Sequence, residues 1–477
     1  MTAPTATAAA VADAARYAGQ WLEVQQRLTR VPGVQVAVAH GDDLLLSRAY
    51  GLADVAAGTA LTTRHLFRVA SHSKMFTATA VLQLAEAGLL RLDDPVESWL
   101  APLTGTPLGA ASLRDLLGHG AGVSRDSTDG DFWQLFAPFP DAERLLAVTG
   151  PGSGAPIRPV AERFKYSNLG FGLLGQVIEA ASGLTFGEYV RARIAAPLGL
   201  EATGSEWDPA RAAQFATGHT GAATAAAQDS PRQGIDPIDT RALAPATGVY
   251  STAEDLVRFA AAHYLGDSRL LSDAAKRRMQ HSEWSAVRDG EDYGLGVILT
   301  TIGARRTVGH SGGFPGYITR TILDPVDRFA VSVLTNAIDG PAGALAATIV
   351  RFVNLATEVP APHDVAGLDR FTGRFANLWG LLDVVRLGGR LYAFDPAAGD
   401  PTDHPVHLTV EDDSTLRIGG GTGYGSFGEA FEYTWAPDGS VASLRADSAQ
   451  SVFPVDAYRA AQASGDVVTG SKRNATH

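Results

Sequence analysis

The order of apolar and polar residues at the start of the chain changes from a helical to a strand period. Apolar residues recur with helical spacing over residues 8–29, which predicts an amphipathic helix. Residues 34–38 then alternate between valine and other side chains, Gly41-Asp42 is a turn pair, and three leucines follow at 44–46. This second pattern predicts a β-hairpin directly after the helix.

Helical patterns dominate the middle of the chain, and clear strand patterns return only after residue 290. Residues 71–87 are mostly apolar and predict a helix that ends at Gly88. Residues 218–239 are rich in Ala, Thr, Gln and Asp and predict a long surface excursion. Strand patterns then occur at 294–301, 305–309, 317–323 and 328–335, before a helix at about 340–356. Because the strands are segregated from most of the helices, we expect an α+β fold with an antiparallel sheet.

The pattern changes again near residue 358, where the sequence Glu-Val-Pro-Ala-Pro begins. We expect one domain over residues 1–357 and a linker over 358–368. Residues 369–460 contain short alternating runs separated by turn pairs, which predicts a small all-β domain, a barrel or a sandwich. Residues 461–477 are polar and predict a disordered tail.

Composition narrows the function classes. The 477 residues carry a net charge of −12, which argues against a protein that binds nucleic acid through a basic face. The chain has no cysteine, so thiolate nucleophiles, disulfides and cysteine-ligated metals are excluded. The 12 histidines are scattered without an H-x-x-x-H spacing, and we expect neither a metal nor another cofactor.

The N-terminal segment does not predict export. It has no basic start, and Asp13 and Arg16 interrupt its apolar residues. No segment reaches the ~18–20 uninterrupted apolar residues that a spanning helix needs. We therefore expect a cytoplasmic protein without a membrane partner, and the sequence does not indicate an oligomeric state.

A first candidate for chemistry is Ser71-His72-Ser73-Lys74, at the start of the predicted helix. Residues i and i+3 share one helix face, so the Ser71 hydroxyl and the Lys74 amine can meet. A serine needs a base to act as a nucleophile, and a lysine can be that base where apolar surroundings lower its pKa. Only four of the 39 basic residues are lysines, so the chain uses arginine for general surface charge. The pattern S-x-x-K is nevertheless short enough to arise by chance.

Two further segments carry candidate site residues. Tyr166-Ser167-Asn168 precedes an apolar helix, and a tyrosine can relay a proton while an asparagine amide can bond a peptide group. Alternatively, Asn168 only caps the helix and Tyr166 only packs.

His310-Ser311-Gly312-Gly313 follows a strand pattern, and its glycines would let a substrate approach the strand edge. A plain Gly-rich turn is the alternative there.

The three segments, in this order, resemble the class C β-lactamase and penicillin-binding-protein superfamily of serine hydrolases, whose marks are S-x-x-K, Y-x-N and a [KH]-[ST]-G strand. The resemblance covers about residues 15–355 and includes supporting segments at 116–122, 248–256 and 293–296. It implies an antiparallel sheet flanked by helices plus an all-helical lobe. The region from 369 resembles the lipocalin-like domain that several of these relatives carry.

The resemblance also implies roles for single residues. Ser71 would attack a carbonyl and form an acyl-enzyme, while Lys74 and Tyr166 share the proton transfers. Asn168 would hold the acyl-side amide of the substrate. His310 would assist Tyr166 or the leaving group from the strand, and the N–H groups of Ser71 and Gly313, beside Gly312, would bind the oxyanion.

The third motif begins with His310 where β-lactamases and cell-wall peptidases usually have lysine. That lysine helps to hold a substrate carboxylate, whereas a histidine is mostly neutral near pH 7. The histidine is similar to that of D-aminopeptidases, some esterases and thioesterases that cyclise nonribosomal peptides. We therefore expect hydrolysis of small esters or of amides and peptides that contain D-amino acids. Cyclisation of a peptide thioester, with a carrier-protein-bound substrate, is the alternative.

The sequence also permits two other interpretations of its function. Residues 309–313 also fit G-x-S-x-G, the nucleophile elbow of α/β-hydrolases, which would make Ser311 the nucleophile. That elbow needs a helix directly after the serine, whereas the residues after 313 predict a turn and a strand. The chain could also be a ligand-binding protein without catalysis on the same scaffold, and the retained Ser71, Lys74, Tyr166 and Asn168 weigh against this.

Overall fold

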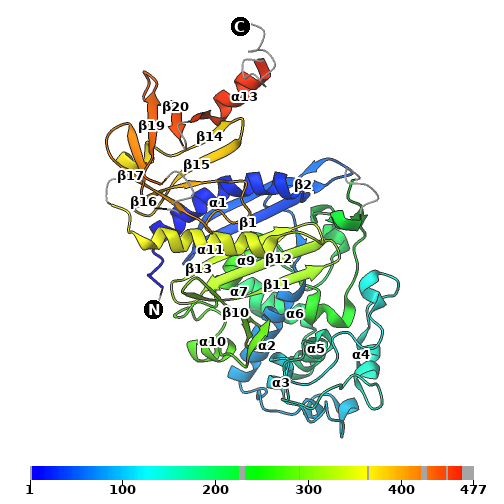
Figure 1. The fold of residues 1–477 in the computed structure, drawn as a ribbon. Helices are drawn as coiled ribbons and strands as arrows, with labels where there is room; N and C mark the ends of the chain where they lie inside the picture. Colours follow the sequence, from blue (N-terminus) through cyan, green and yellow to red (C-terminus); the bar gives the residue numbers. More distant parts are fainter. Residues whose placement is uncertain are drawn as a thin grey trace. The chain divides into compact units, whose positions relative to one another are not determined.

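The computed structural model describes residues 3–224, 231–288, 290–362, 365–420, 427–446 and 450–464, and Figure 1 shows its fold. The chain forms two compact units. The sheet unit comprises Met1–Ala3 and Thr29–Ala347, and the barrel unit comprises Pro4–Leu28 and Thr348–His477.

In the sheet unit, nine strands of the described residues form an antiparallel sheet in the order β3-β2-β1-β13-β12-β11-β10-β9-β8. Strand β13 is buried at every residue, as expected of the centre of a covered sheet. The arrangement confirms the predicted α+β fold with an antiparallel sheet. The strands are β1 Gly33–His40, β2 Asp43–Asp54, β3 Thr59–Ala60, β8 Trp284–Arg288, β9 Glu291–Tyr293, β10 Ile298–Ile302, β11 Arg305–Phe314, β12 Tyr317–Asp324 and β13 Phe329–Thr335.

Two strand predictions differ from the structure. The pattern over 294–301 is not one strand, because the chain turns after Tyr293 and β10 begins at Ile298. This turn approaches the helix after Ser71 so closely that a Cβ on Gly296 would lie 2.9 Å from the Lys74 carbonyl oxygen. Strand β11 also continues beyond residue 309 to Phe314. Its Ser-Gly-Gly sequence has no apolar alternation, and pairing with β12 holds it as a strand.

Helices α2 to α10 all lie in the long stretch of chain between β3 and β8, whereas β1 to β3 and β8 to β13 follow one another without a helix (Figure 1). Those of the sheet unit are α2 Ser73–Glu86, α3 Leu113–Leu117, α4 Ala142–Thr149, α5 Asn168–Ser182, α6 Phe186–Tyr189, α7 Ala196–Leu198, α8 Ala244–Thr247, α9 Ala253–Ala261 and α10 Asp273–Met279, together with the short 3₁₀ turn η1 Ala70–His72 and the π-helical segment η5 Val190–Ala195.

Helix α2 is buried on nearly all sides, which fits its continuous run of apolar and small residues. It ends before Gly88, whose φ of 71° allows the left-handed turn that a side chain would oppose. Phe76 stacks on Phe259 of α9 with ring centroids 3.9 Å apart, and Thr79 Oγ1 lies 3.0 Å from His263 Nε2. The helix that follows Ser71 is therefore fixed in the core.

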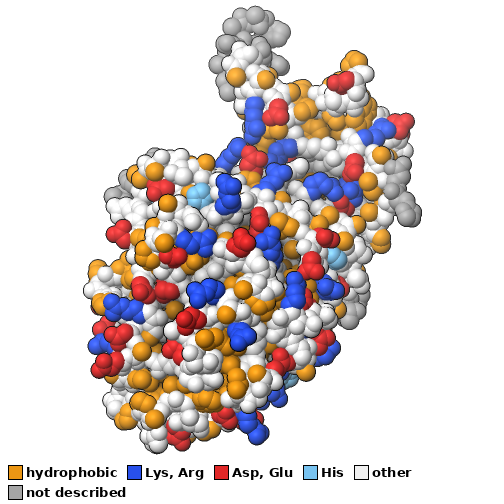
Figure 2. Space-filling model, turned by 180° about the vertical axis from the view of Figure 1, so that it is seen from behind, with side chains coloured by type: hydrophobic (Ala, Val, Ile, Leu, Met, Phe, Trp, Pro, Cys, Tyr) orange, Lys and Arg blue, Asp and Glu red, His pale blue; other side chains and the backbone are white. Residues whose placement is uncertain are grey.

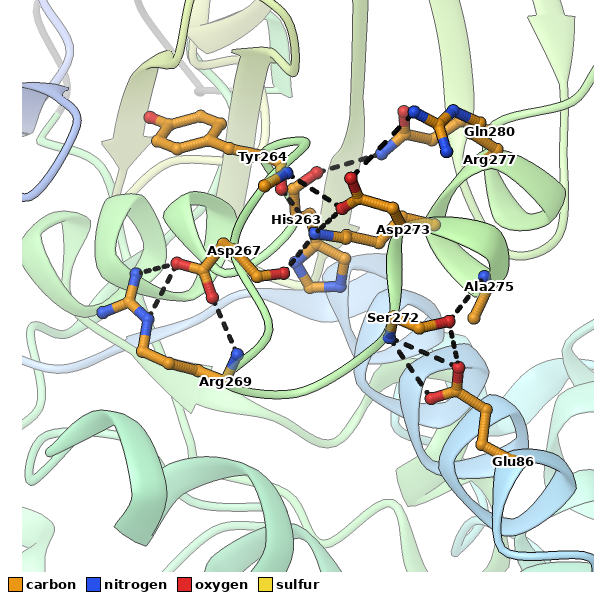
Figure 3. A network of polar contacts seen from close by, with 12 residues as sticks. Glu86, His263, Tyr264, Asp267, Arg269, Ser272, Asp273, Ala275, Arg277 and Gln280 are labelled. Carbon is orange, nitrogen blue, oxygen red and sulfur yellow. Dashed lines mark hydrogen bonds and ion pairs between the residues drawn. The ribbon is translucent and has the colours of Figure 1, made fainter.

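A polar network ties the C-terminal end of α2 to α10 (Figure 3). Glu86 accepts hydrogen bonds from Ser272, the N-cap residue of α10. The buried Lys276 amine donates to the Tyr264 carbonyl at 2.6 Å and lies 2.7 Å from the Asp273 carboxylate. Lys276 thus has a structural role, because its amine bonds residues near both ends of the connection between α9 and α10.

In the barrel unit, eight described strands close into an antiparallel barrel, because β14 pairs with both β15 and β21. This confirms the expected all-β domain. The strands are β14 Gly373–Asn377, β15 Gly380–Leu387, β16 Arg390–Phe394, β17 Val406–Val410, β18 Thr415–Ile418, β19 Ala430–Trp435, β20 Val441–Ala446 and β21 Gln450–Pro454. The helices are α1 Ala8–Thr29, α12 Ala366–Asp369, α13 Val455–Ser464 and the larger part of α11 Ala342–Glu358, whose residues 342–347 belong to the sheet unit.

The N-terminal helix α1 packs within the barrel unit. Tyr17 contacts Phe352 of α11 and Phe394 of β16, with ring centroids 4.9 and 5.5 Å apart. Buried Asp13 accepts hydrogen bonds from the Arg386 guanidinium, with Nη2 2.9 Å from Oδ1. The helical period predicts the apolar face of α1, but the sequence does not say which part of the chain covers it.

The compact units divide the chain differently from the boundaries predicted at 357, 368 and 460. They group residues 4–28 and 348–357 with the barrel rather than with the sheet. The predicted linker includes the last residue of α11 and part of α12, and its residues 363 and 364 lie outside the described residues. The predicted tail begins inside α13, and its residues from 465 on also lie outside them.

No single helix among the described residues is long and apolar enough to cross a bilayer, although α5 and the bent segment Phe186–Leu198 together meet the criteria of length and composition. Over the face drawn in Figure 2, acidic and basic side chains are mixed.

We predict that Asp13→Ala destabilises the barrel unit by about 2–3 kcal/mol, because it removes a buried partner from Arg386 while Asp369 remains at 2.6 Å. Glu23→Ala on the same helix removes an exposed pair with Arg27 and should change the free energy of unfolding by less than about 0.5 kcal/mol. Urea unfolding followed by circular dichroism compares the two. Equal shifts for both variants would contradict the structural role of the Asp13–Arg386 pair.

Candidate active site

The candidate nucleophile Ser71 lies in η1, directly before α2. The preceding residue Ala70 has a φ of 51°, a left-handed conformation that is strained for a residue with a Cβ. Neighbouring bonds hold this turn: Ser73 Oγ donates to the Ala70 carbonyl at 2.6 Å and accepts from the Val249 N–H at 3.0 Å. Ser71 itself remains partly exposed, so its hydroxyl is accessible while its backbone is fixed.

Lys74 is 0% exposed, and its amine contacts three oxygens. Nζ lies 2.8 Å from Asn168 Oδ1, 2.9 Å from the Ala246 carbonyl oxygen and 3.3 Å from Ser71 Oγ. Burial lowers the pKa of Lys74 well below its ordinary value, the Asp126 charge opposes this shift, and the Arg125 charge adds to it. A neutral amine has two N–H groups and one lone pair. When the two N–H groups bond Asn168 and Ala246, the lone pair faces the Ser71 hydroxyl.

Tyr166 supplies a second hydrogen bond to the nucleophile. Its hydroxyl donates to Ser71 Oγ at 2.8 Å. Burial raises the pKa of Tyr166 to about 12, and the bond with Ser71 acts in the opposite direction. Tyr166 therefore keeps its proton at neutral pH, and Lys74 is the group able to accept the proton of Ser71.

Asn168 is the first residue of α5, but it does not cap that helix. Ser167 is the N-cap, and its hydroxyl accepts a hydrogen bond from the Gly170 N–H at 3.0 Å. The Asn168 side chain is buried between Lys74 and Asp126, and its Nδ2 donates to Asp126 Oδ1 at 2.8 Å. The structure thus favours the site interpretation of Asn168 over the capping alternative.

His310 lies on β11 close to this group, with both ring nitrogens engaged. Nδ1 lies 2.6 Å from the Ser311 carbonyl oxygen and Nε2 lies 3.1 Å from the Tyr293 hydroxyl. A carbonyl oxygen only accepts, so Nδ1 carries the proton and Nε2 accepts from Tyr293. Burial lowers the pKa of His310 well below its ordinary value. Within the described part of the chain, no hydrogen bond joins His310 to Ser71, Lys74 or Tyr166.

The two glycines of the third motif lie where β11 passes the nucleophile turn. A Cβ on Gly312 would come within 2.3 Å of the Val69 carbonyl oxygen, so only glycine fits there. Strands β11 and β12 are joined by the two-residue turn Pro315-Gly316, and a hydrogen-bonded pair is expected next to such a turn. Pairs alternate along the strands, so Gly313 falls on a non-bonded pair and its N–H is expected to point away from β12.

Ser311 does not lie on a nucleophile elbow. It is in the middle of β11, and the chain continues through a turn into β12 rather than into a helix. The geometry required for the α/β-hydrolase alternative is therefore absent from these described residues.

Three residues that the sequence reading did not assign complete this group. Asp126 binds the Asn168 amide, and Tyr293 binds His310. His119 is 2% exposed, its Nδ1 accepts from the Ser167 N–H at 3.2 Å, and its ring lies 4.3 Å from the Tyr166 ring. His119 and Tyr293 lie in segments that support the family resemblance, so the sequence could have identified them as site residues. Asp126 lies in a loop without any pattern, and only the fold brings it to Asn168.

His72 and Ser73, between Ser71 and Lys74, have structural contacts. His72 Nδ1 lies 2.9 Å from the Val69 carbonyl oxygen and Nε2 lies 2.9 Å from Thr321 Oγ1 of β12. Burial lowers the pKa of His72 to about 3, so the ring stays neutral. His72 therefore attaches the nucleophile turn to the sheet. Among the described residues, no group of three or more His, Asp or Glu side chains is arranged to hold a metal ion.

Comparisons with known proteins identify the family of the chain. A family model described as Beta-lactamase matches residues 22–355. The chain is 31% identical over 319 residues to Penicillin-binding protein 4* of Bacillus subtilis (strain 168), covering 63% of this chain and 67% of that protein. It is 30% identical over 376 residues to esterase EstB of Burkholderia gladioli, covering 67% of this chain and 90% of that protein.

A solved structure is also similar. The D-stereospecific amidohydrolase from Streptomyces sp. superposes with a TM-score of 0.57 and is 26% identical, over 68% of this chain and 94% of that chain. The family model spans more than half of the chain, and its range contains all three sequence motifs. The resemblance inferred from these motifs is confirmed, and the chain belongs to the beta-lactamase family of serine hydrolases.

Proposed function

We propose that this chain hydrolyses small esters or amides of D-amino acids through an acyl-enzyme on Ser71. One observation carries the proposal: Ser71 Oγ lies 2.8 Å from the Tyr166 hydroxyl and 3.3 Å from the amine of the fully buried Lys74. A hydroxyl between a protonated phenol and an uncharged amine has a proton acceptor on one side and a proton donor on the other.

The acylation step follows from these contacts. Ser71 Oγ attacks the carbonyl carbon while its proton passes to the Lys74 lone pair. The N–H groups of Ser71 and Gly313 hold the oxyanion. The bond to the leaving group breaks, that group takes the Tyr166 proton, and Tyr166 recovers a proton from Lys74.

Deacylation reverses these proton transfers. Water attacks the acyl carbonyl and gives its proton to the same relay, and Ser71 Oγ leaves with a proton. In this scheme His310, neutral and bonded to Tyr293, positions the strand beside the site, and its assistance to Tyr166 stays a prediction. The names of two relatives, an esterase and a D-stereospecific amidohydrolase, supply the substrate classes.

We predict that Ser71→Ala lowers kcat/KM for p-nitrophenyl acetate by at least about 10³-fold, because the acyl-enzyme cannot form. It also abolishes the covalent adduct that a fluorophosphonate leaves on the chain, seen by intact-protein mass spectrometry. Ser311→Ala is the matched control and should retain the adduct and most of the turnover. Unimpaired turnover by Ser71→Ala, or loss of turnover by Ser311→Ala alone, would refute the assignment.

We also predict the direction of the pH dependence. Because burial depresses the pKa of Lys74, its uncharged form persists to lower pH than in an ordinary lysine. Hydrolysis of a neutral ester should therefore proceed at pH values above that lowered pKa. Its kcat/KM should fall as the pH falls through the lowered pKa, with a midpoint well below about 10. Lys74→Arg cannot supply an uncharged base and should remove the activity at every pH.

The variant His310→Gln shows, in the same pH experiment, whether Lys74 or His310 is the group whose titration produces the acid limb. His310 is neutral because of its burial, so its removal should leave the midpoint of the acid limb in place even where the rate changes. Disappearance of the limb in this variant would assign the titration to His310 instead.

A further inference from the structure

The Asp126 carboxylate is one side chain away from the catalytic lysine. Asn168 bridges the two, with Oδ1 2.8 Å from Lys74 Nζ and Nδ2 2.8 Å from Asp126 Oδ1. We propose that Asp126 selects substrates whose acyl residue carries a free ammonium group next to the attacked carbonyl. This inference rests on the proposed function and narrows its substrate class.

Within the described part of the chain, no buried cation forms an ion pair with the Asp126 carboxylate. Its ion pair is with Arg125, at 3.1 Å, and the Arg125 side chain is 64% exposed. Such an exposed pair is weak and screened by solvent. The Asp126 side chain is itself 14% exposed, and it lines a cavity.

A carboxylate in this place distinguishes two kinds of acyl group. It has acceptor sites and no donor, so it binds an ammonium through charge-assisted hydrogen bonds. The carbonyl oxygen of an N-acylated substrate is an acceptor and would be repelled at short range. One of the two Asn168 amide hydrogens is also engaged by Asp126, which weakens the clamp for an acylamide.

The space next to Asp126 indicates the side chain that accompanies the ammonium. Asp126 lines a cavity of about 340 Å³ together with Phe132, Phe139 and Leu169. These residues offer an aromatic and aliphatic surface. Arg144 and Arg241 line the same cavity together with Asp129 and Asp141, so these charges offset one another and the apolar surface sets the preference. The combination fits an amino acid with a free amine and an apolar or aromatic side chain.

Matched substrates test the proposal. The wild-type protein should cleave D-phenylalanine p-nitroanilide with a kcat/KM at least 10-fold above that for its N-acetyl derivative near pH 7. Asp126→Asn keeps the size of the side chain but removes its charge, and should reduce this ratio at least 10-fold, mainly through KM for the free amine. Asp131→Asn, which changes an exposed carboxylate on the same segment that does not line the cavity, should leave the ratio unchanged.

A second measurement uses the unaltered protein, in case Asp126→Asn does not fold. D-Phenylalaninol should inhibit p-nitrophenyl acetate turnover at least 10-fold more strongly than N-acetyl-D-phenylalaninol. The difference should vanish above the pKa of the free amine. Equal inhibition, a preference for the N-acetyl substrate, or an unchanged ratio in a folded Asp126→Asn variant would overturn the proposal.

These experiments distinguish a failure of the Asp126 proposal from a failure of the proposed function. Ser71-dependent hydrolysis of p-nitrophenyl acetate without any amine preference would remove the role of Asp126 and leave the acyl-enzyme intact. Turnover that survives Ser71→Ala would remove the proposed function, whatever the amine preference.

Discussion

The central constraint in this protein is the burial of one amine. Lys74 is enclosed by the core around α2 and α5, and the cost of burying a charge in that place favours its uncharged form. Two oxygens from other elements, Asn168 Oδ1 and the Ala246 carbonyl, take its N–H groups. The remaining lone pair is thereby directed to Ser71, so burial and hydrogen bonding together produce a base next to a hydroxyl.

The rest of the sheet unit keeps this arrangement rigid. The strained turn at Ala70 is held by Ser73 and by the attachment of His72 to Thr321. Helix α2 is surrounded by core side chains, and its far end is fastened to α10. The reacting groups come from different parts of the chain: Ser71 from η1, Lys74 from α2 and Tyr166 from the loop directly before α5. The site therefore exists only when the sheet and its helices are assembled.

Periodic patterns and short motifs predicted much of this structure. The spacing of Ser71 and Lys74 on one helix turn, the hairpin at 34–46 and the all-β C-terminal region follow from local physics, because each depends on residues close in sequence. The sequence predicts too short a strand β11, because Ser311, Gly312 and Gly313 have no strand propensity and are held by pairing with β12. Asp126 and the grouping of α1 with the barrel depend on contacts between distant residues, and no local pattern reports them.

Burial lowers the pKa of the Lys74 amine well below its ordinary value, and the composition permits a direct measurement of this shift. The chain has only four lysines, so ¹³C labelling of lysine gives at most four side-chain signals, and Lys74→Arg identifies one of them. Titration of these signals by NMR should show the Lys74 signal changing at a pH well below that of an ordinary lysine. A Lys74 signal that titrates near about 10.4, as in an exposed lysine, would contradict the account.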